Sequence, residues 1–399
     1  MGRKLIICMD GNGNEVGFEQ TNILRLYQSL KKDSDTQLAY YVPGVGTNDA
    51  QKIAGAATQK VRGLAGLAFG LGLEDNVLKA FRFLCQNYQK GDDILCFGFS
   101  RGAYTVRVLA GFLHNFGLMR PNELHLAPRV FRAYRQLSYK SEDMKADLRY
   151  QHLREYGKAI DASVVPIRYL GLFDTVSSII RIRKPVRNLI SKKAIIEYGT
   201  HKNVDKNVSV KMVRHALAID EKRAMFRAQH WIKTDYYGNR FKTGAAQEQD
   251  VKQMWFAGYH SDVGGSPPED RAGIGKLSLS WMLDELAEAG LALEFRRNAK
   301  ERYILGEDED ARTPGDLQYS KPDPMAPIHD SLESKWRFAE WLPKSRDRRE
   351  PPNTGKGSLW YLPRGEARFI PEDHLIHPSV FERREQSDYD PENLKGRDA

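Results

Sequence analysis

Residues Gly91–Phe116 read GDDILCFGFSRGAYTVRVLAGFLHNF, and this stretch decides the fold. Ile94–Phe97 is a short apolar run after a Gly-Asp-Asp turn, which predicts a buried strand of a parallel sheet. Beyond Ser100, apolar residues recur from Ala103 to Leu113 at the spacing of one helical face. The stretch therefore predicts a strand, a sharp turn and a helix.

The turn, Gly98-Phe99-Ser100-Arg101-Gly102, has a Gly-x-Ser-x-Gly pattern. Glycines suit a turn with a strained central serine, because side chains beside it would collide with the strand and the helix. Such a turn lifts the Ser100 hydroxyl above the sheet, and the N–H of Arg101 faces any oxyanion formed there. Ser100 is thus a candidate nucleophile. The alternative is a tight turn whose serine caps the helix.

The length of 399 residues allows one large domain or two smaller ones, and 41% apolar with 28% charged residues is ordinary for a globular protein. The sequence predicts neither a transmembrane helix nor a signal peptide, so we expect synthesis and folding in a cytosol. The net charge of +9 comes from scattered residues, without a nucleic-acid-binding motif, and we expect no nucleic-acid partner. Cys8, Cys85 and Cys96 lie in apolar patterns typical of buried free thiols.

A second apolar run, Leu5–Met9, predicts a strand that ends in the loop Asp10-Gly11-Asn12-Gly13-Asn14. Open α/β sheets bind ligands at this edge. The N–H groups of Gly11 and Asn12 are therefore candidates to complete an oxyanion hole with that of Arg101. A metal-dependent phosphatase that uses Asp10 is an alternative, but the aspartate usual two residues later is replaced by Asn12.

The neighbouring segments alternate between strand and helix patterns. Leu38–Val42 predicts a strand and Glu74–Tyr88 a helix, which together indicate an α/β sheet with crossover connections. The glycine-rich segment Ala54–Leu73 fits either a mobile cover over the site or core packing. The charged segment from Glu123 to about Tyr156 predicts a helical insertion beside the site.

Two downstream strands end in side chains that suit a Ser-Asp-His enzyme. Val164–Phe173 is followed by Asp174, where this architecture keeps the acid that orients the histidine, although an aspartate there can also simply cap the next segment. Met254–Ala257 leads to His260 in a glycine-rich loop, and we expect His260 to be the general base. His377 is an alternative base, because histidine often comes last in such enzymes.

Three further patterns complete the main domain. Met212–Phe226 predicts an amphipathic helix that carries a structural histidine, His215, and Leu277–Ala289 predicts another helix. His260 and Asp262 have the spacing of two metal ligands, but no third ligand stands out, so we expect no metal and no cofactor.

Several ordered segments resemble one family of α/β-hydrolases, which includes the catalytic domains of type VI secretion phospholipase effectors. They are Met9-Asp10-Gly11, Gly98–Ala103, Leu172–Val176, His215–Glu221 and Gly258–Gly265, with Ile376–Arg383 resembling a closing segment. The resemblance runs from about residue 3 to residue 290. It implies a mainly parallel sheet with helices on both faces and helical insertions.

The resemblance also implies chemistry. Ser100 is then the nucleophile, Asp174 the orienting acid and His260 the base for hydrolysis of acyl esters, which are phospholipid esters in the effectors. It implies an ester or phospholipid substrate, peripheral membrane contact, a secretion or immunity partner, and delivery by a secretion system without a signal peptide. Family members commonly have Thr where this chain has Asn12.

We expect residues 1–300 to form the catalytic domain, with the insertion at about 120–160, and residues 301–399 to form a C-terminal extension packed on it, with extended structure in its proline-bearing stretches. Four aromatic residues should anchor this extension, namely Trp336, Trp341, Trp360 and Tyr361. The sequence predicts a serine hydrolase that cleaves carboxylic esters, especially of lipids, through an acyl-enzyme. The alternatives are a non-catalytic or regulatory relative, or the metal-dependent phosphatase.

Overall fold

The computed structural model describes residues 2–11, 20–44, 72–139, 156, 160–176, 180–182, 196–198, 203–313, 316–332, 334–345 and 360–397. Three predictions therefore lie wholly or largely outside the described residues. They concern Asn12, most of the glycine-rich segment 54–73 and the second half of the insertion at 120–160.

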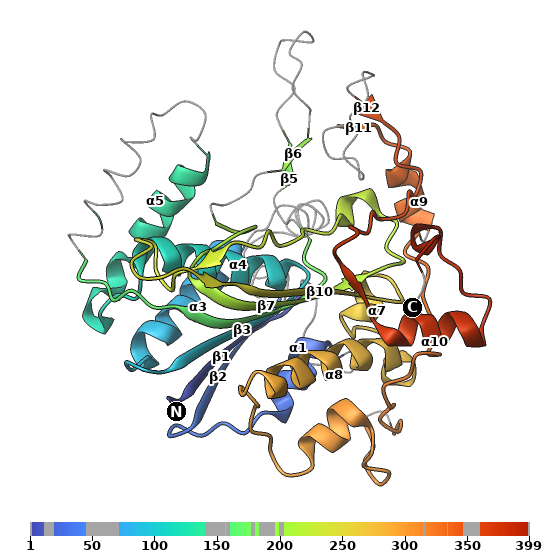
Figure 1. Cartoon of the computed structure of the whole chain (residues 1–399), viewed down its shortest axis with the longest axis horizontal. Helices are drawn as coiled ribbons and strands as arrows, with labels where there is room; N and C mark the ends of the chain where they lie inside the picture. The colour runs from blue at the N-terminus through green and yellow to red at the C-terminus, as the bar shows by residue number, and fades with distance from the viewer. Residues whose placement is uncertain are drawn as a thin grey trace, which may run out of the picture.

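Seven strands form one sheet in which every neighbouring pair is parallel (Figure 1). In spatial order they are β13 (Leu375–Ile376), β10 (Asp250–Phe256), β7 (Val210–Ala218), β4 (Ile167–Phe173), β3 (Asp93–Phe99), β1 (Lys4–Met9) and β2 (Gln37–Val42). The predicted α/β fold with a mainly parallel sheet is confirmed.

The order of the strands reverses beside β1. From β1 the chain moves outward to β2, returns to β3 on the other side of β1, and then continues through β4, β7, β10 and β13. In open parallel sheets, the crevice at the carboxyl ends of the strands beside such a reversal is the usual ligand site. Because Asp10 follows β1 and Ser100 follows β3, both residues lie at this position.

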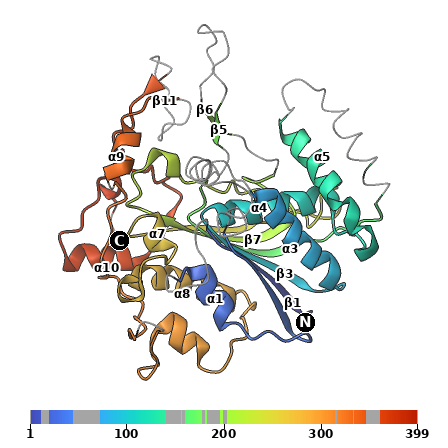
Figure 2. The same cartoon turned by 180° about the vertical axis from the view of Figure 1, so that it is seen from behind.

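Helices cover both faces of the sheet (Figures 1 and 2). One face carries α3 (Leu73–Asn87), α4 (Arg101–Phe116) and α5 (Ala127–Tyr139), and the other carries α1 (Asn22–Ser29) and α8 (Gly273–Glu288). Strand β3 serves both layers, since Ile94 and Cys96 join the first core while Leu95 and Phe97 join the second. All three cysteines are buried free thiols, as predicted.

The remaining elements are short. They are η2 (Pro121–Leu126), β5 (Ile180–Ile182), β6 (Ile196–Tyr198), η3 (Ala224–Phe226), β8 (Asp235–Tyr236), β9 (Gln247–Glu248), α7 (His260–Val263), η4 (Glu269–Arg271), the π-helix η5 (Glu301–Leu305), α9 (Ser334–Glu340), β11 (Lys344–Ser345), β12 (Trp360–Tyr361), α10 (Pro378–Gln386) and η7 (Glu392–Leu394). Within the described part of the chain, none of the helices is both long and apolar enough to cross a bilayer.

The helix predicted over Met212–Phe226 is wrong, because the segment begins in the central strand β7, which runs to Ala218, and only the short η3 follows at its end. Residues Val213 to Ala218 of the strand are buried, so its pattern lacks the alternation of a half-exposed strand. The polar residues that resemble a helix's exposed face are Arg214 and His215. Both are buried in the sheet, where Arg214 pairs with Asp250 and Glu285.

The segment after residue 300 packs against the sheet and contributes β13 to it. Its apolar residues join β7 and β10 in a third core, which includes Leu217, Trp255, Ile370, Val380 and Leu394. This segment also contains the helices α9 and α10, which were not predicted from the sequence. Among the predicted aromatic anchors, Trp336 packs edge-on against Phe226, whereas Trp341 and Trp360 are 59% and 39% exposed.

Helix α4 approaches β1 and β3 so closely that two positions have no room for a side chain. A Cβ at Gly102 would lie 2.1 Å from the Met9 carbonyl oxygen, and one at Gly98 would lie 2.6 Å from the Cα of Ala103. Both contacts are shorter than real Cβ atoms make. The two glycines flank Ser100, so their close packing sets the position of the serine.

We expect Gly102→Ala to lower the free energy of unfolding by about 2 kcal/mol or more, since the new methyl group meets backbone that cannot move aside. Urea denaturation measures this change. The matched control is Gly244→Ala, where φ is +95° and no atom lies within 4 Å of the added Cβ, so only backbone strain of roughly 1 kcal/mol remains. Equal losses in the two variants would contradict the steric explanation.

Candidate active site

Ser100 stands at the turn between β3 and α4 in a strained backbone conformation, with φ 56° and ψ −122°. This is a region that residues with side chains rarely adopt, and such strain concentrates at functional sites. The Ser100 N–H donates to the Phe173 carbonyl at 3.0 Å, which ties the turn to the end of β4. The serine is 6% exposed.

His260 is the first residue of α7, which follows β10 after three residues, and its two ring nitrogens contact Ser100 and Asp174. The distance from Nε2 to the Ser100 Oγ is 2.7 Å, and the distance from Nδ1 to the Asp174 Oδ2 is 2.5 Å. An ionised carboxylate only accepts hydrogen bonds, so Nδ1 carries the proton and Nε2 accepts from the serine hydroxyl. The ring is held between Phe99 and Phe226, with centroids 4.9 Å and 5.1 Å away.

Asp174 follows β4 and is fully buried, also with a positive φ of 38°. Its Oδ1 accepts from the N–H of Ala218 at 3.1 Å and from Arg368 Nη1 at 2.6 Å. Its Oδ2 accepts from Arg368 Nη2 at 3.0 Å and from His260. Three separate parts of the chain thus contribute hydrogen-bond donors to this one carboxylate.

These contacts set the protonation states. Burial alone would raise the pKa of Asp174, but the charge of Arg368 and the hydrogen bond from His260 outweigh it and hold the pKa well below its usual range. Burial lowers the pKa of His260, and the opposing attraction of Asp174 does not cancel this effect. At neutral pH the site therefore contains a carboxylate, a neutral imidazole and a serine hydroxyl.

His215, predicted to be structural, supports Asp174 from β7. The N–H of Thr175 donates to His215 Nε2 at 3.1 Å, so Nδ1 carries the proton and faces Gln253 Oε1 at 3.4 Å. Burial, followed by the nearby charge of Arg107, holds the pKa of His215 well below its ordinary value. A neutral His215 thus fixes the backbone next to Asp174.

The predicted oxyanion donors have different surroundings. Arg101 supplies the first N–H of α4, a position where the helix provides no internal acceptor. The N–H of Gly11 instead donates to the Asp10 carboxylate at 2.7 Å, so the structure does not support the expectation that it faces an oxyanion. Asn12 lies outside the described residues. A Cβ at Gly11 would lie 3.3 Å from that of Ser100, which places this loop beside the serine.

The Asp10 carboxylate accepts hydrogen bonds from several elements of the fold. Besides Gly11, it accepts from the hydroxyl of Thr21, the N-cap of α1, at 2.6 Å and from Tyr41 of β2 at 2.8 Å. Asp10 therefore links β1, α1 and β2.

The pair of candidate metal ligands, His260 and Asp262, is engaged in other contacts. Asp262 accepts from the N–H of Tyr259 and contacts the ring Nδ1 of His329 at 2.6 Å, whereas His260 contacts Ser100 and Asp174. In the ranges that the structure describes, no three His, Cys, Asp or Glu residues gather as metal ligands.

His377, the alternative base, is not hydrogen-bonded to the serine. Its Nδ1 contacts Ser379 Oγ at 2.8 Å and caps α10, and its ring stacks on Phe256 at 4.6 Å. The structure therefore brings His260, and not His377, to Ser100 and Asp174.

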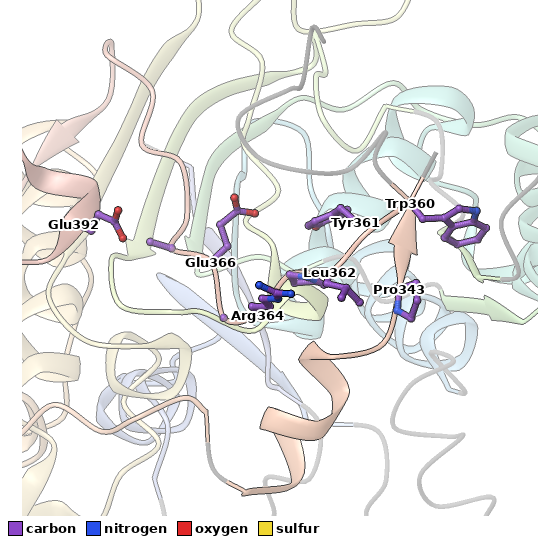
Figure 3. Close-up of a pocket in the computed structure, with 10 residues that line it drawn as sticks. Pro343, Trp360, Tyr361, Leu362, Arg364, Glu366 and Glu392 are labelled. Atoms are coloured by element: carbon purple, nitrogen blue, oxygen red, sulfur yellow. The ribbon is translucent and has the colours of Figure 1, made fainter. Parts of the chain in front are cut away.

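A surface pocket lies in the C-terminal segment rather than at these residues (Figure 3). Glu366 and Glu392 lie toward one end of it and Pro343 and Trp360 toward the other. None of Ser100, Asp174 or His260 lines this pocket.

Similarity to known proteins shows the family of the chain. The family model described as type VI secretion system phospholipase effector Tle1-like, catalytic domain, matches residues 3–285. The chain belongs to this family. An uncharacterized protein of Saccharomyces cerevisiae is 29% identical over 233 residues, which are 57% of this chain and 32% of the yeast protein.

Two solved structures are also similar. The crystal structure of an uncharacterized protein from Pseudomonas aeruginosa shares 20% identity, with a TM-score of 0.39, over 74% of this chain and 47% of that one. The Tle1 effector bound to the VgrG spike from the type VI secretion system shares 19% identity, with a TM-score of 0.28, over 66% of this chain and 51% of that one. The present chain thus spans about a third to a half of the length of these relatives.

Sequence reasoning missed Arg368, which lies beyond the part of the chain that the Tle1-like family model matches. An isolated arginine between Ala367 and Phe369 has no motif around it. Its place in the site depends on a contact with Asp174, a residue 194 positions earlier.

Replacement of His377 tests the effect of a buried neutral histidine on stability. Its pKa is near 6.5 when unfolded and is lowered by burial to about 4 when folded. Between these values the unfolded chain binds a proton that the folded protein does not, so stability falls as the pH drops. His377→Asn keeps an N-capping group, and we expect its stability relative to wild type to rise by about 2 kcal/mol from pH 7 to pH 5.

Urea denaturation of both proteins at the two pH values measures this difference. A parallel loss of stability in wild type and variant would show that His377 does not titrate as its burial implies.

Proposed function

We propose that the protein is a serine hydrolase that cleaves carboxylic esters through an acyl-enzyme on Ser100. The observation that supports this most directly is the hydrogen-bonded series of Ser100, His260 and Asp174, with Ser100 at the strand-order reversal of a parallel sheet. Nucleophile, base and orienting acid are the three roles that acyl transfer requires, and their geometry defines such a site across unrelated folds.

In the proposed reaction, His260 Nε2 takes the proton of the Ser100 hydroxyl as Oγ attacks the ester carbonyl. The carbonyl oxygen becomes an oxyanion, which the Arg101 N–H stabilises, while Asp174 stabilises the imidazolium. The C–O bond to the alcohol then breaks and the alcohol leaves with the proton from His260. A water molecule repeats the sequence on the acyl-enzyme and releases the carboxylic acid, which regenerates the serine.

The proposed substrate class is a lipid ester, specifically a phospholipid. This rests on membership of the Tle1-like phospholipase effector family. Synthesis in the cytoplasm, delivery by a secretion system and a partner within that system or an immunity protein are further proposals with the same basis.

Peripheral contact with a lipid surface fits the exposed apolar residues of α9 and the residues after it. Phe338, Trp341 and Leu342 are 74%, 59% and 51% exposed. Trp336, on the same helix, packs on Phe226, which in turn contacts the ring of His260. Tryptophan and phenylalanine insert readily at the boundary between water and lipid, so this contact would bring the site close to its substrate.

We expect Ser100→Ala to lower the turnover of a short acyl ester roughly 10⁴-fold or more, because loss of one member of a triad has effects of this size. Hydrolysis of p-nitrophenyl butyrate measures it, with circular dichroism to show that the variant is folded. A fluorophosphonate probe should label Ser100 in wild type and fail to label it in His260→Ala.

His377→Asn is the matched control and should keep turnover within about threefold of wild type. Undiminished hydrolysis by folded Ser100→Ala would remove the proposal. A wild-type protein that neither reacts with the probe nor hydrolyses any ester would indicate the non-catalytic alternative, and hydrolysis abolished by EDTA would indicate the metal-dependent one.

A mechanism through an acyl-enzyme on Ser100 also determines which products a phospholipid should give. Vesicles of phosphatidylethanolamine or phosphatidylglycerol should release free fatty acid and lysophospholipid, since an acyl group is transferred first to serine and then to water. Mass spectrometry of the lipid extract distinguishes these products. Release of diacylglycerol or of phosphatidic acid would show cleavage at the phosphate and would contradict this proposal.

A further inference from the structure

Arg368 is a fully buried cation whose guanidinium group contacts both oxygens of Asp174. It belongs to residues 360–370, which we call the C-terminal strap. Nη1 donates to Oδ1 at 2.6 Å and Nη2 donates to Oδ2 at 3.0 Å, the two-pronged geometry for which a planar guanidinium is suited. Lysine could not reproduce both contacts with one ammonium group.

The remaining contacts fix the guanidinium in place. Nη1 also donates to the Ala218 carbonyl at 3.1 Å, at the end of β7, and Nη2 donates to the carbonyl of Phe226, the residue that packs against His260. The backbone of the strap is held as well, since the side chain of Asn393 donates to the Arg368 carbonyl at 3.1 Å. Ile370, two residues later, is buried in the third core.

This contact decides the state of the Asp174 carboxylate. A carboxylate with no exposure to water is unfavourable unless a positive charge and hydrogen bonds compensate it. Without Arg368, burial would raise the pKa of Asp174, and a protonated carboxyl group would be a poorer acceptor for the His260 Nδ1–H. The positive charge also opposes protonation of His260, whose ring lies on the other side of the carboxylate.

Other titratable groups around the site do not replace Arg368. Behind Asp174, burial is the main cause that lowers the pKa values of His215 and His230, so both are neutral. Glu221 and Arg223 lie on the side of His260, where they pair with each other. Among the described residues, Arg368 is the one permanent cation that contacts the Asp174 carboxylate.

We propose that Arg368 is a positioning residue for the serine hydrolase, holding Asp174 ionised and aligned with the imidazole of His260. The inference rests on the proposed function. It makes the C-terminal strap part of the catalytic unit, although the family model ends at residue 285.

The test compares Arg368→Gln and Arg368→Lys in the full chain with Arg214→Gln as a matched control. Arg214 is also a buried arginine paired with carboxylates, Asp250 and Glu285, but no described contact joins it to the three proposed catalytic residues. The pH dependence of kcat/KM for p-nitrophenyl butyrate is measured for each, together with kcat and KM at pH 7.

We expect Arg368→Gln to lower kcat at least 100-fold with KM changed less than threefold, and to move the acid limb of the profile upward by about one pH unit. Loss of the cation favours protonation of both Asp174 and His260, and either effect moves the limb in this direction. Arg368→Lys should retain part of the wild-type kcat, and its acid limb should lie close to that of wild type. Arg214→Gln should lower Tm and leave the limb in place. An unchanged limb in folded Arg368→Gln would overturn the inference.

Two measurements do not depend on activity. Titration of the Asp174 carboxyl carbon by ¹³C NMR should show a higher pKa in Arg368→Gln than in wild type, and an unchanged value overturns the inference even if no ester is hydrolysed by any variant. If Arg368→Gln does not fold, the double variant Asp174→Asn with Arg368→Gln should fold, because it removes the uncompensated charge. Failure of the double variant to improve on the single one would also overturn the inference. Absence of hydrolysis by wild type, in contrast, removes only the proposed function.

Discussion

The contact between α4 and the ends of β1 and β3 is the constraint on which the rest of the site depends. Gly98 and Gly102 allow a helix to pack directly against backbone, and in the turn between them Ser100 has a positive φ. Without support from its surroundings, this backbone conformation of Ser100 is unfavourable by about 1–3 kcal/mol. It persists because the apolar residues of α4 and β3 are buried in two cores on opposite faces of the sheet.

Beside this turn, charged groups are buried in the protein. Arg368 donates hydrogen bonds to Asp174, Asp174 contacts the ring of His260, and the aromatic rings of Phe99 and Phe226 pack on either side of the imidazole. Removing one partner of such a buried ion pair typically costs about 3–5 kcal/mol. The same contacts that align the site therefore stabilise the fold, and their effects on activity and on stability are coupled.

The sequence predicts the features that depend on neighbouring residues. The turn at Ser100, the strands before Asp174 and His260, and the α/β class all follow from local runs of apolar residues and glycines. The pattern failed at β7, where buried arginine and histidine imitate the polar face of a helix because their partners come from distant elements.

Other contacts could not be predicted because they join residues that are far apart in the sequence or depend on the exact local backbone. Nothing near Arg368 in the sequence indicates that it contacts the carboxylate that follows β4, and nothing near Gly11 shows that its N–H donates to the adjacent aspartate. The exposure of Trp341 and Trp360 could not be predicted either, because the sequence alone does not show whether an aromatic residue lies in a core or on the surface.

The ion pair between residues 174 and 368 has a consequence for the order in which a ribosome makes the molecule. The acid emerges 194 residues before its cationic partner. At about 5–20 residues per second, that interval lasts roughly 10–40 s. In the later part of this interval, once residue 260 has emerged, the nascent chain contains serine, carboxylate and histidine but lacks the arginine that holds the carboxylate. For the proposed hydrolase, the acid therefore gains its cationic partner only after residue 368 has left the ribosome.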